Sequence, residues 1–95
     1  MPYKLKFTKI AEKDILHLKK NEPLAYRKLW ILIDEVCTHP YSGKGKPKPL
    51  SENRAGQWSR RITKKHRLVY IVSEKTVTII VISAAGIMMI SNLIE

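Results

Sequence analysis

The sequence predicts an α+β fold in which a two-helix hairpin packs on one face of a mostly antiparallel four-stranded sheet. Two observations lead to this fold. Apolar residues recur at helical spacing in two consecutive segments of the first half, and β-branched or alternating segments fill most of the second half. The expected order is β-α-α-β-β-β, within a single domain over residues 1–95. The sheet face that the helices leave uncovered is expected to be polar.

The first half of the chain begins with a strand and continues with two helices. Residues 3–7 alternate between apolar side chains and lysine, which is typical of a half-buried strand. Thr8 offers an N-cap for an apolar helical stripe that extends to about Lys20. Residues 21–23, Asn-Glu-Pro, supply a cap residue and a first-turn proline for a second helix, which residues 38–40 end. The short separation between the helices favours an antiparallel hairpin.

The second half alternates between loop-forming and strand-forming composition. Residues 41–56 are rich in glycine, proline and lysine, and they predict a basic loop. Residues 57–63 and 67–72 predict two strands joined by a tight polar turn at Lys64 and Lys65. Residues 76–83 are almost all β-branched, which predicts a central strand of the sheet.

The charge of the chain is strongly positive and unevenly spread. Eighteen Lys and Arg against eight Asp and Glu give a net charge of +10. Half of the cations lie between residues 44 and 67, where Glu52 is the only acid; they are Lys44, Lys46, Lys48, Arg54, Arg60, Arg61, Lys64, Lys65 and Arg67. Such a cluster predicts a polyanionic partner, nucleic acid before membrane. The alternative is that the charge only keeps the chain in solution.

The remaining features of composition narrow the class of protein. Cys37 is the only cysteine and lies in an apolar helical pattern, so we expect a buried structural thiol and neither a disulfide nor a zinc site. The first residues lack the apolar core of a signal peptide, so a cytoplasmic protein is expected. Residues 76–94 carry no charge and approach membrane-spanning length. Polar residues interrupt that stretch, however, and the sheet needs residues 76–83.

Three blocks of sequence resemble a known family. They are residues 43–50 (GKGKPKPL), 56–63 (GQWSRRIT) and 66–70 (HRLVY), and their content and spacing are similar to those of the YoeB/Txe group of bacterial toxins in the RelE superfamily. The resemblance implies a RelE-like fold and the toxin of a toxin–antitoxin pair. Such a toxin enters the ribosomal A site and cleaves mRNA without a metal or other cofactor, by attack of the ribose 2′-OH on the adjacent phosphate. The implied partners are mRNA, the ribosome with its 16S rRNA, an acidic YefM-like antitoxin and a possible second copy of the toxin.

The resemblance also implies catalytic residues, and two of them fall on positions that can be compared here. Arg67 matches the family's strand arginine, which neutralises the phosphate; the alternative is a solvated arginine at a strand end. Lys48 stands where the family usually has a glutamate. A lysine is a poor proton acceptor unless its pKa is strongly lowered. We therefore expect Lys48 to act as a transition-state cation, with a general base or a plain RNA-steering lysine as alternatives.

Other cations of the same region are expected to bind RNA: Lys44, Lys46, Arg61, Lys64 and Lys65. Strand alternation places Arg61 on the outer face with Ser59, whereas Trp58 and Ile62 point to the core. Arg60 shares the inner parity, so we expect its stem to be partly buried and assign it no role. His66 is expected to be a turn or structural histidine.

The family's C-terminal His-Tyr pair has no counterpart in the sequence. No His or Tyr follows Tyr70, and residues 86–95 form an atypical tail. One back-translation of residues 86–92 contains, in a shifted frame, codons for His-Tyr-Asp-Asp-Lys and a stop. We infer a single-nucleotide frameshift and expect impaired catalysis in this copy. The alternative function is that of a non-catalytic, basic RNA-binding protein.

Overall fold

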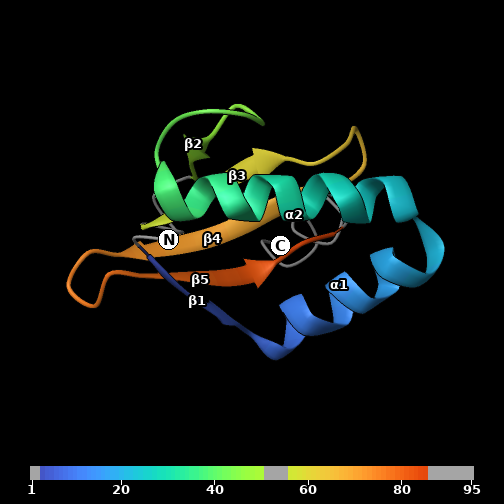
Figure 1. Cartoon of the computed structure of the whole chain (residues 1–95), viewed down its shortest axis with the longest axis horizontal. Helices are drawn as coiled ribbons and strands as arrows, with labels where there is room; N and C mark the ends of the chain where they lie inside the picture. The colour runs from blue at the N-terminus through green and yellow to red at the C-terminus, as the bar shows by residue number, and fades with distance from the viewer. Residues whose placement is uncertain (1–2, 51–55, 86–95) are drawn as a thin grey trace.

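The computed structural model describes residues 3–50 and 56–85, and within them five strands form one sheet in the order β1-β5-β4-β3-β2 (Figure 1). The first strand pairs with β5 in parallel, and the other neighbours are antiparallel. The elements are β1 (Lys4–Phe7), α1 (Lys9–Asn21), α2 (Pro23–Thr38), β2 (Lys48–Pro49), β3 (Gln57–Arg61), β4 (Arg67–Ser73) and β5 (Thr78–Ser83). The α+β class and the mostly antiparallel sheet are confirmed.

The expected number of four strands is wrong, because the basic loop contains the short strand β2. It pairs with β3, with Lys48 opposite Ser59 and Pro49 opposite Trp58. A proline cannot donate to a strand ladder, and it is therefore tolerated at an edge such as this one. Gly45 and Pro47 just before it, and Pro49 within it, conceal so short a strand from sequence patterns.

The two helices confirm the expected hairpin, and they run in opposite directions from their joint at Glu22 (Figure 1). Thr8 caps α1 as expected: its Oγ1 accepts a hydrogen bond from the amide of Ala11 at 3.1 Å and donates one to the carbonyl of Ile82 at 2.7 Å. The cap of α2 differs from the expected pattern. Its N-cap position is Glu22, without a side-chain cap bond, while Asn21 ends α1 and donates to the carbonyl of His17.

The hydrophobic core lies between the two helices and the sheet, and α2 contributes most of its helical residues. Leu29, Ile33 and Val36 of α2 are buried against a sheet surface that includes Tyr70 and Ile79. Cys37 is fully buried, and desolvation raises the pKa of its thiol above the ordinary value. The expectation of a structural thiol is thus consistent with its surroundings.

The fifth strand and the outer sheet face differ from expectation in two ways. The strand begins at Thr78 rather than residue 76, because residues 74–77 form a turn that ends on Val77 at a φ of 51°. The sheet face away from the helices is not polar at its centre: Ile71 lies opposite Ile80 there, and Val69 is fully buried. Interior strands carry apolar residues on both faces, and β4 and β5 are both interior.

None of the helices in residues 3–50 and 56–85 is long and apolar enough to cross a membrane. The atypical tail, residues 86–95, lies outside the described residues.

Candidate nucleic-acid interface

A small cationic pocket lies on the sheet face opposite the helices. It has a volume of about 110 Å³, and it is lined by Gly45, Lys46, Lys48, Arg61 and Arg67. Three separate segments contribute these side chains: the basic loop with β2, the end of β3 and the start of β4. The strand register explains why the two arginines lie side by side, because Arg61 is paired directly with Arg67.

Ser59 lies on β3 between the strands that carry Lys48 and Arg67. It is fully buried, and its neighbours across the strands are Lys48 on β2 and Val69 on β4. Its Oγ accepts a hydrogen bond from Nη1 of Arg67 at 3.3 Å. Arg67 is half-buried, whereas Arg61 and Lys48 are exposed. One arginine is thus held against the sheet, and the other cations project beside it.

Four of the seven sequence-predicted site residues meet at this pocket, namely Lys46, Lys48, Arg61 and Arg67. The expected outward orientation of Arg61 is confirmed by its exposure and by its pairing with Arg67. These facts place the residues together; the roles assigned to them remain predictions.

The other three predicted residues do not line the pocket. Lys44 is exposed, and it uses its backbone: the amide donates to the Glu35 carboxylate, and the carbonyl accepts from Arg60. Lys64 and Lys65 are exposed in the turn between β3 and β4. They lie beyond the ends of these two strands and outside the pocket lining.

The basic loop approaches β3 closely because of its glycines. Gly45 has a φ of 81°, and its carbonyl accepts a hydrogen bond from the amide of Arg61 at 2.7 Å. A Cβ at Gly45 would lie 3.0 Å from the Arg61 carbonyl oxygen and 3.1 Å from the Arg60 Cβ. Lys46, the next residue, also has a positive φ, of 51°. This left-handed backbone turns the loop towards the pocket.

Arg60 is the residue that sequence reasoning underestimated. Its stem was expected to be partly buried, but the whole residue is buried at 0% exposure. Its guanidinium binds four backbone or side-chain groups near the end of α2, and its Nε donates to the hydroxyl of Tyr70. The available signal was its parity with Trp58, which points an arginine into the core. A buried arginine requires several acceptors, and these come from a loop distant in sequence.

His66 is a structural histidine, as expected. It is 4% exposed, and its Nε2 lies 2.9 Å from Oε2 of Glu22 at the joint of the helices. The hydrogen bond to His66 is the main cause that lowers the pKa of Glu22, and the charge of Lys65 contributes less. His66 therefore holds the β3–β4 turn against the helices, and it directly precedes Arg67 of the pocket lining without lining the pocket itself.

The arrangement can stabilise negative charge better than it can move protons. Among the described residues, those that line the pocket include no carboxylate, thiol or imidazole. Two arginines and two lysines around one cavity match the charge and geometry of a phosphate group. Within residues 3–50 and 56–85, no three His, Cys, Asp or Glu side chains gather where they could hold a metal ion.

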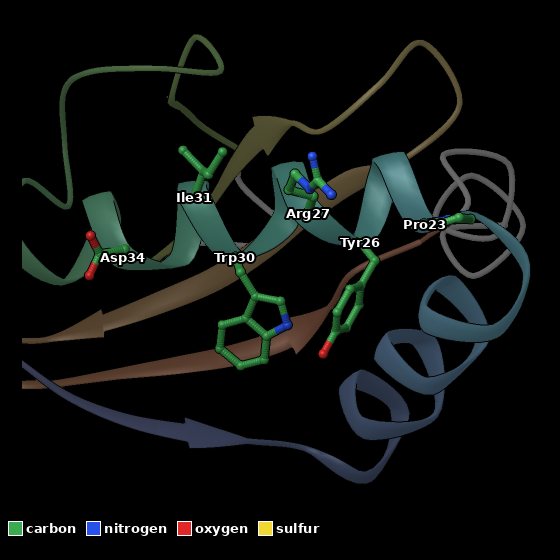
Figure 2. Close-up of a pocket in the computed structure, with 6 residues that line it drawn as sticks. All are labelled: Pro23, Tyr26, Arg27, Trp30, Ile31 and Asp34. Atoms are coloured by element: carbon green, nitrogen blue, oxygen red, sulfur yellow. The ribbon is translucent and has the colours of Figure 1, made fainter.

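A larger hollow of about 580 Å³ lies on the outer surface of α2, away from these cations. Figure 2 shows its lining residues, Pro23, Tyr26, Arg27, Trp30, Ile31 and Asp34. Trp30 packs edge-on against Tyr26 and Phe7, with ring centroids 6.4 and 6.1 Å apart. The hollow is mostly apolar, and it brings together none of the sequence-predicted site residues.

Comparison with known proteins identifies the class to which this chain belongs. Residues 7–84 match the family model of the YoeB-like toxin of bacterial type II toxin-antitoxin systems. Toxin YoeB of Synechocystis sp. is 38% identical over 77 residues, which cover 81% of this chain and 90% of that protein. Toxin YoeB of Escherichia coli K12 is 42% identical over 66 residues, covering 70% and 79%.

Solved structures give the same result. A YoeB/ParE toxin from Agrobacterium tumefaciens superposes with a TM-score of 0.83 at 36% identity, covering 87% of this chain and 96% of that one. The YoeB dimer from Staphylococcus aureus superposes with a TM-score of 0.81 at 29% identity, covering 90% and 97%. The fold is thus that of a bacterial toxin of a type II toxin–antitoxin system. The chain belongs to the YoeB-like toxin family, as its sequence blocks indicated.

Proposed function

We propose that this chain is a ribosome-dependent toxin that binds mRNA in the A site, and that the family's reaction is cleavage of that mRNA. The toxins of this family are endoribonucleases. The observation that carries the proposal is the convergence of Lys46, Lys48, Arg61 and Arg67 on one phosphate-sized pocket. A folded site with four cations and no lining acid, among the described residues, fits an RNA backbone.

The proposed reaction makes and breaks one bond at phosphorus. The ribose 2′-oxygen loses its proton and attacks the adjacent phosphate, and the bond to the 5′-oxygen breaks as that oxygen gains a proton. A 2′,3′-cyclic phosphate and a 5′-hydroxyl result. Negative charge builds up on the non-bridging oxygens, and fixed cations stabilise it.

The roles proposed for the residues follow their positions. Arg67, held by Ser59, contacts the scissile phosphate, and Lys48 stabilises the transition state from the loop side. Arg61 and Lys46 bind the same or the next phosphate. Lys44, Lys64 and Lys65, which are exposed outside the pocket, steer the mRNA or contact 16S rRNA.

We further propose that catalysis is impaired in this copy. The family's general acid would belong to a His-Tyr pair, and residues 86–89 are Gly-Ile-Met-Met at that place. Among the described residues, the pocket lining supplies no imidazole or carboxylic acid in its place, and its titratable side chains are lysines and arginines. A positioned general acid or base contributes about 10²–10⁴-fold to a rate, so its loss leaves binding with little cleavage. A single-nucleotide frameshift accounts for the altered tail.

The second candidate function is RNA binding without any catalytic role, and the lack of a carboxylate, thiol or imidazole among the described residues that line the pocket favours it. The two candidates are separated by primer extension on mRNA from translating ribosomes. An impaired enzyme regains cleavage when a His-Tyr pair is supplied at residues 87 and 88. A pure binding protein occupies the ribosome and leaves the mRNA intact with either tail.

The proposed regulatory partner is an acidic antitoxin that neutralises the +10 charge of the chain. A YoeB–YefM toxin–antitoxin complex from Staphylococcus aureus is a heterotetramer, and the toxin of the same organism is solved as a dimer. By analogy, this chain would bind a YefM-like protein, and a second copy of itself is a further possible partner. Action on the ribosome places it in the cytoplasm.

A further inference from the structure

The cationic pocket depends on the placement of a loop. Arg61 and Arg67 are carried by paired strands, so the sheet fixes their backbone. Lys46 and Lys48 belong to the segment between α2 and β3, where the two-residue strand β2 is the only regular element among the described residues. Two residues of strand pairing give little stability on their own. Contacts other than the pairing of β2 must therefore hold the loop where its two lysines share a cavity with the two arginines.

The buried side chain of Arg60, on the face of β3 that packs towards the helices, is hydrogen-bonded to the beginning of that loop. Nη2 of Arg60 donates to the carbonyls of His39 and Ser42, the latter at 2.9 Å. Its Nη1 donates to the carbonyl of Lys44 at 3.1 Å. These three carbonyls follow one another along the turn that leaves α2. Arg60 therefore binds the loop's backbone at several points, independently of the loop's side chains.

Glu35, in the last turns of α2, contacts both Arg60 and the loop. Its Oε1 lies 3.1 Å from Nη1 of Arg60, and it also accepts a hydrogen bond from the amide of Lys44. Gly43 lies against the same carboxylate, with a φ of 113°, and a Cβ there would collide with Glu35 Oε1. A residue with a side chain at position 43 would have to displace the carboxylate. The glycine, the acid and the arginine thus fit together as one unit.

Tyr70 anchors this unit to the sheet. Its hydroxyl accepts from Nε of Arg60 at 3.1 Å and donates to the carbonyl of Pro40 at 2.6 Å. The side chain of Tyr70 is fully buried on β4. The neighbouring residue of the arginine continues the connection, because the amide of Arg61 holds the carbonyl of Gly45. The loop is therefore held by two consecutive residues of β3, through the buried side chain of Arg60 and through the backbone amide of Arg61.

We propose that Arg60 and Glu35 are positioning residues for RNA binding. Their ion pair and their hydrogen bonds to the backbone of residues 39–44, which we call the clasp, hold the loop in place. In this position Lys46 and Lys48 face Arg61 and Arg67 around one RNA phosphate. The inference rests on the proposed function for the identity of the anion. It predicts that breaking the clasp removes the contribution of the two lysines and spares that of the two arginines. A residue that only stabilises the fold would lower the folded fraction and leave the lysines' contribution to binding unchanged.

The test is a double-mutant cycle on binding of short single-stranded RNA, measured between low and physiological salt. The clasp is broken by Glu35→Ala, and in a second protein by Gly43→Ala, because removal of the buried Arg60 itself risks unfolding. The lysines are removed together by Lys46→Ala with Lys48→Ala. In the otherwise natural chain this should lower the salt slope by about 0.7 for each phosphate that the lysines no longer neutralise. In the Glu35→Ala background the same lysine substitutions should change affinity less than twofold.

Glu22→Gln is the matched control, since Glu22 lies at the opposite end of α2 from Glu35, and the change weakens its ion pair with His66 without removing a hydrogen bond to the loop. It should leave the full effect of the lysines in place. Thermal melting of each variant confirms that it is folded. If the lysine substitutions weaken RNA binding equally in the natural, Glu35→Ala and Gly43→Ala backgrounds, the clasp does not position them and the inference is wrong.

Hydrogen exchange separates this failure from failure of the proposed function. The amides of Lys44 and Arg61, which hold the loop, should exchange faster in Glu35→Ala than in Glu22→Gln. If the natural chain binds no RNA at any salt, the proposed function is wrong, and faster exchange still shows that the clasp orders the loop. Unchanged exchange at both amides in Glu35→Ala would overturn the inference whatever the RNA result.

Discussion

Arg67 at the start of β4 donates a hydrogen bond from Nη1 to Oγ of Ser59 on β3, at 3.3 Å. Ser59 is fully buried, so its hydroxyl is a fixed acceptor. An arginine held at one nitrogen loses less conformational freedom when it binds a phosphate. The serine thereby orients a cation that the proposed function places on the scissile group.

This relationship predicts graded effects on ribosome binding. Arg67→Ala should weaken binding and reduce the salt slope by about 1, as expected when one phosphate is no longer neutralised. Ser59→Ala keeps the charge, so it should weaken binding to a smaller extent and leave the slope unchanged. Sedimentation of the protein with programmed ribosomes at several salt concentrations measures both. A Ser59→Ala effect as large as that of Arg67→Ala would show that the hydroxyl does more than orient the arginine.

The charge of the chain predicts an acidic binding partner. Nine cations among residues 44–67 and a net charge of +10 favour a partner segment rich in Asp and Glu that folds over this surface. Co-expression with the product of the adjacent upstream gene should yield a complex that co-purifies and dissociates at high salt. Recovery of this chain alone from such an experiment would contradict the prediction.

The altered tail predicts that catalysis can be restored. Ile87→His with Met88→Tyr, and truncation shortly afterwards, should raise ribosome-dependent cleavage by about 10²–10⁴-fold, the usual contribution of a general acid. Primer extension on mRNA from translating ribosomes gives the rate. Ile87→Gln with Met88→Phe and the same truncation is the control, since it provides similar shapes without a titratable ring. An inert restored variant, or an unaltered chain that already cleaves as fast, would disprove the assigned chemistry.

The clasp predicts how stability depends on pH. The hydrogen bond from the Lys44 amide, followed by the charge of Arg60, lowers the pKa of Glu35 below its ordinary value of 4.5. A lowered folded-state pKa adds stability above pH 4.5, and this stability is lost as the pH falls through the folded value. The difference in Tm between the natural chain and Glu35→Gln should therefore shrink below pH 4.5. The other acids, such as Asp14, are present in both proteins, so their protonation lowers both Tm values. If the difference in Tm stays constant as the pH falls well below 4.5, the charge of Glu35 does not stabilise the clasp.

Sequence patterns were sufficient for the parts of the fold that rest on periodicity. The cap at Thr8 and the two helical stripes follow from local rules, and the structure agrees with them. On β4, Leu68, Tyr70 and Val72 join the core as alternation predicts. Burial on that strand does not alternate, however, because Val69 is fully buried as well. The short strand β2 could not be predicted, because Pro49 within it and Gly45 and Pro47 just before it indicate a loop. The start of β5 at Thr78 was not predicted either, because Thr76 and Val77 have strand-forming side chains but lie in a turn.

The candidate site was predictable in composition and only partly in arrangement. Charge clustering and alternation pointed to Lys48, Arg61 and Arg67, and these residues meet at one pocket. The same clustering also included Lys64 and Lys65, which lie in a turn outside the lining. Charge density along a sequence does not distinguish neighbours in space. The clasp of Arg60 with Glu35 joins residues 25 positions apart, and only the packed structure reveals it.

The central claim is that the pocket's four cations bind the RNA backbone on the ribosome. The direct test is the dissociation constant for mRNA-programmed ribosomes as a function of salt, with Lys46, Lys48, Arg61 and Arg67 all changed to Ala. The control removes the same charge from the exposed side of α1, by changing Lys9, Lys13, Lys19 and Lys20 to Ala. The account predicts that the pocket variant loses most of its affinity and salt slope, while the control loses little. Equal losses in the two variants would contradict it, since net charge alone would then explain the binding.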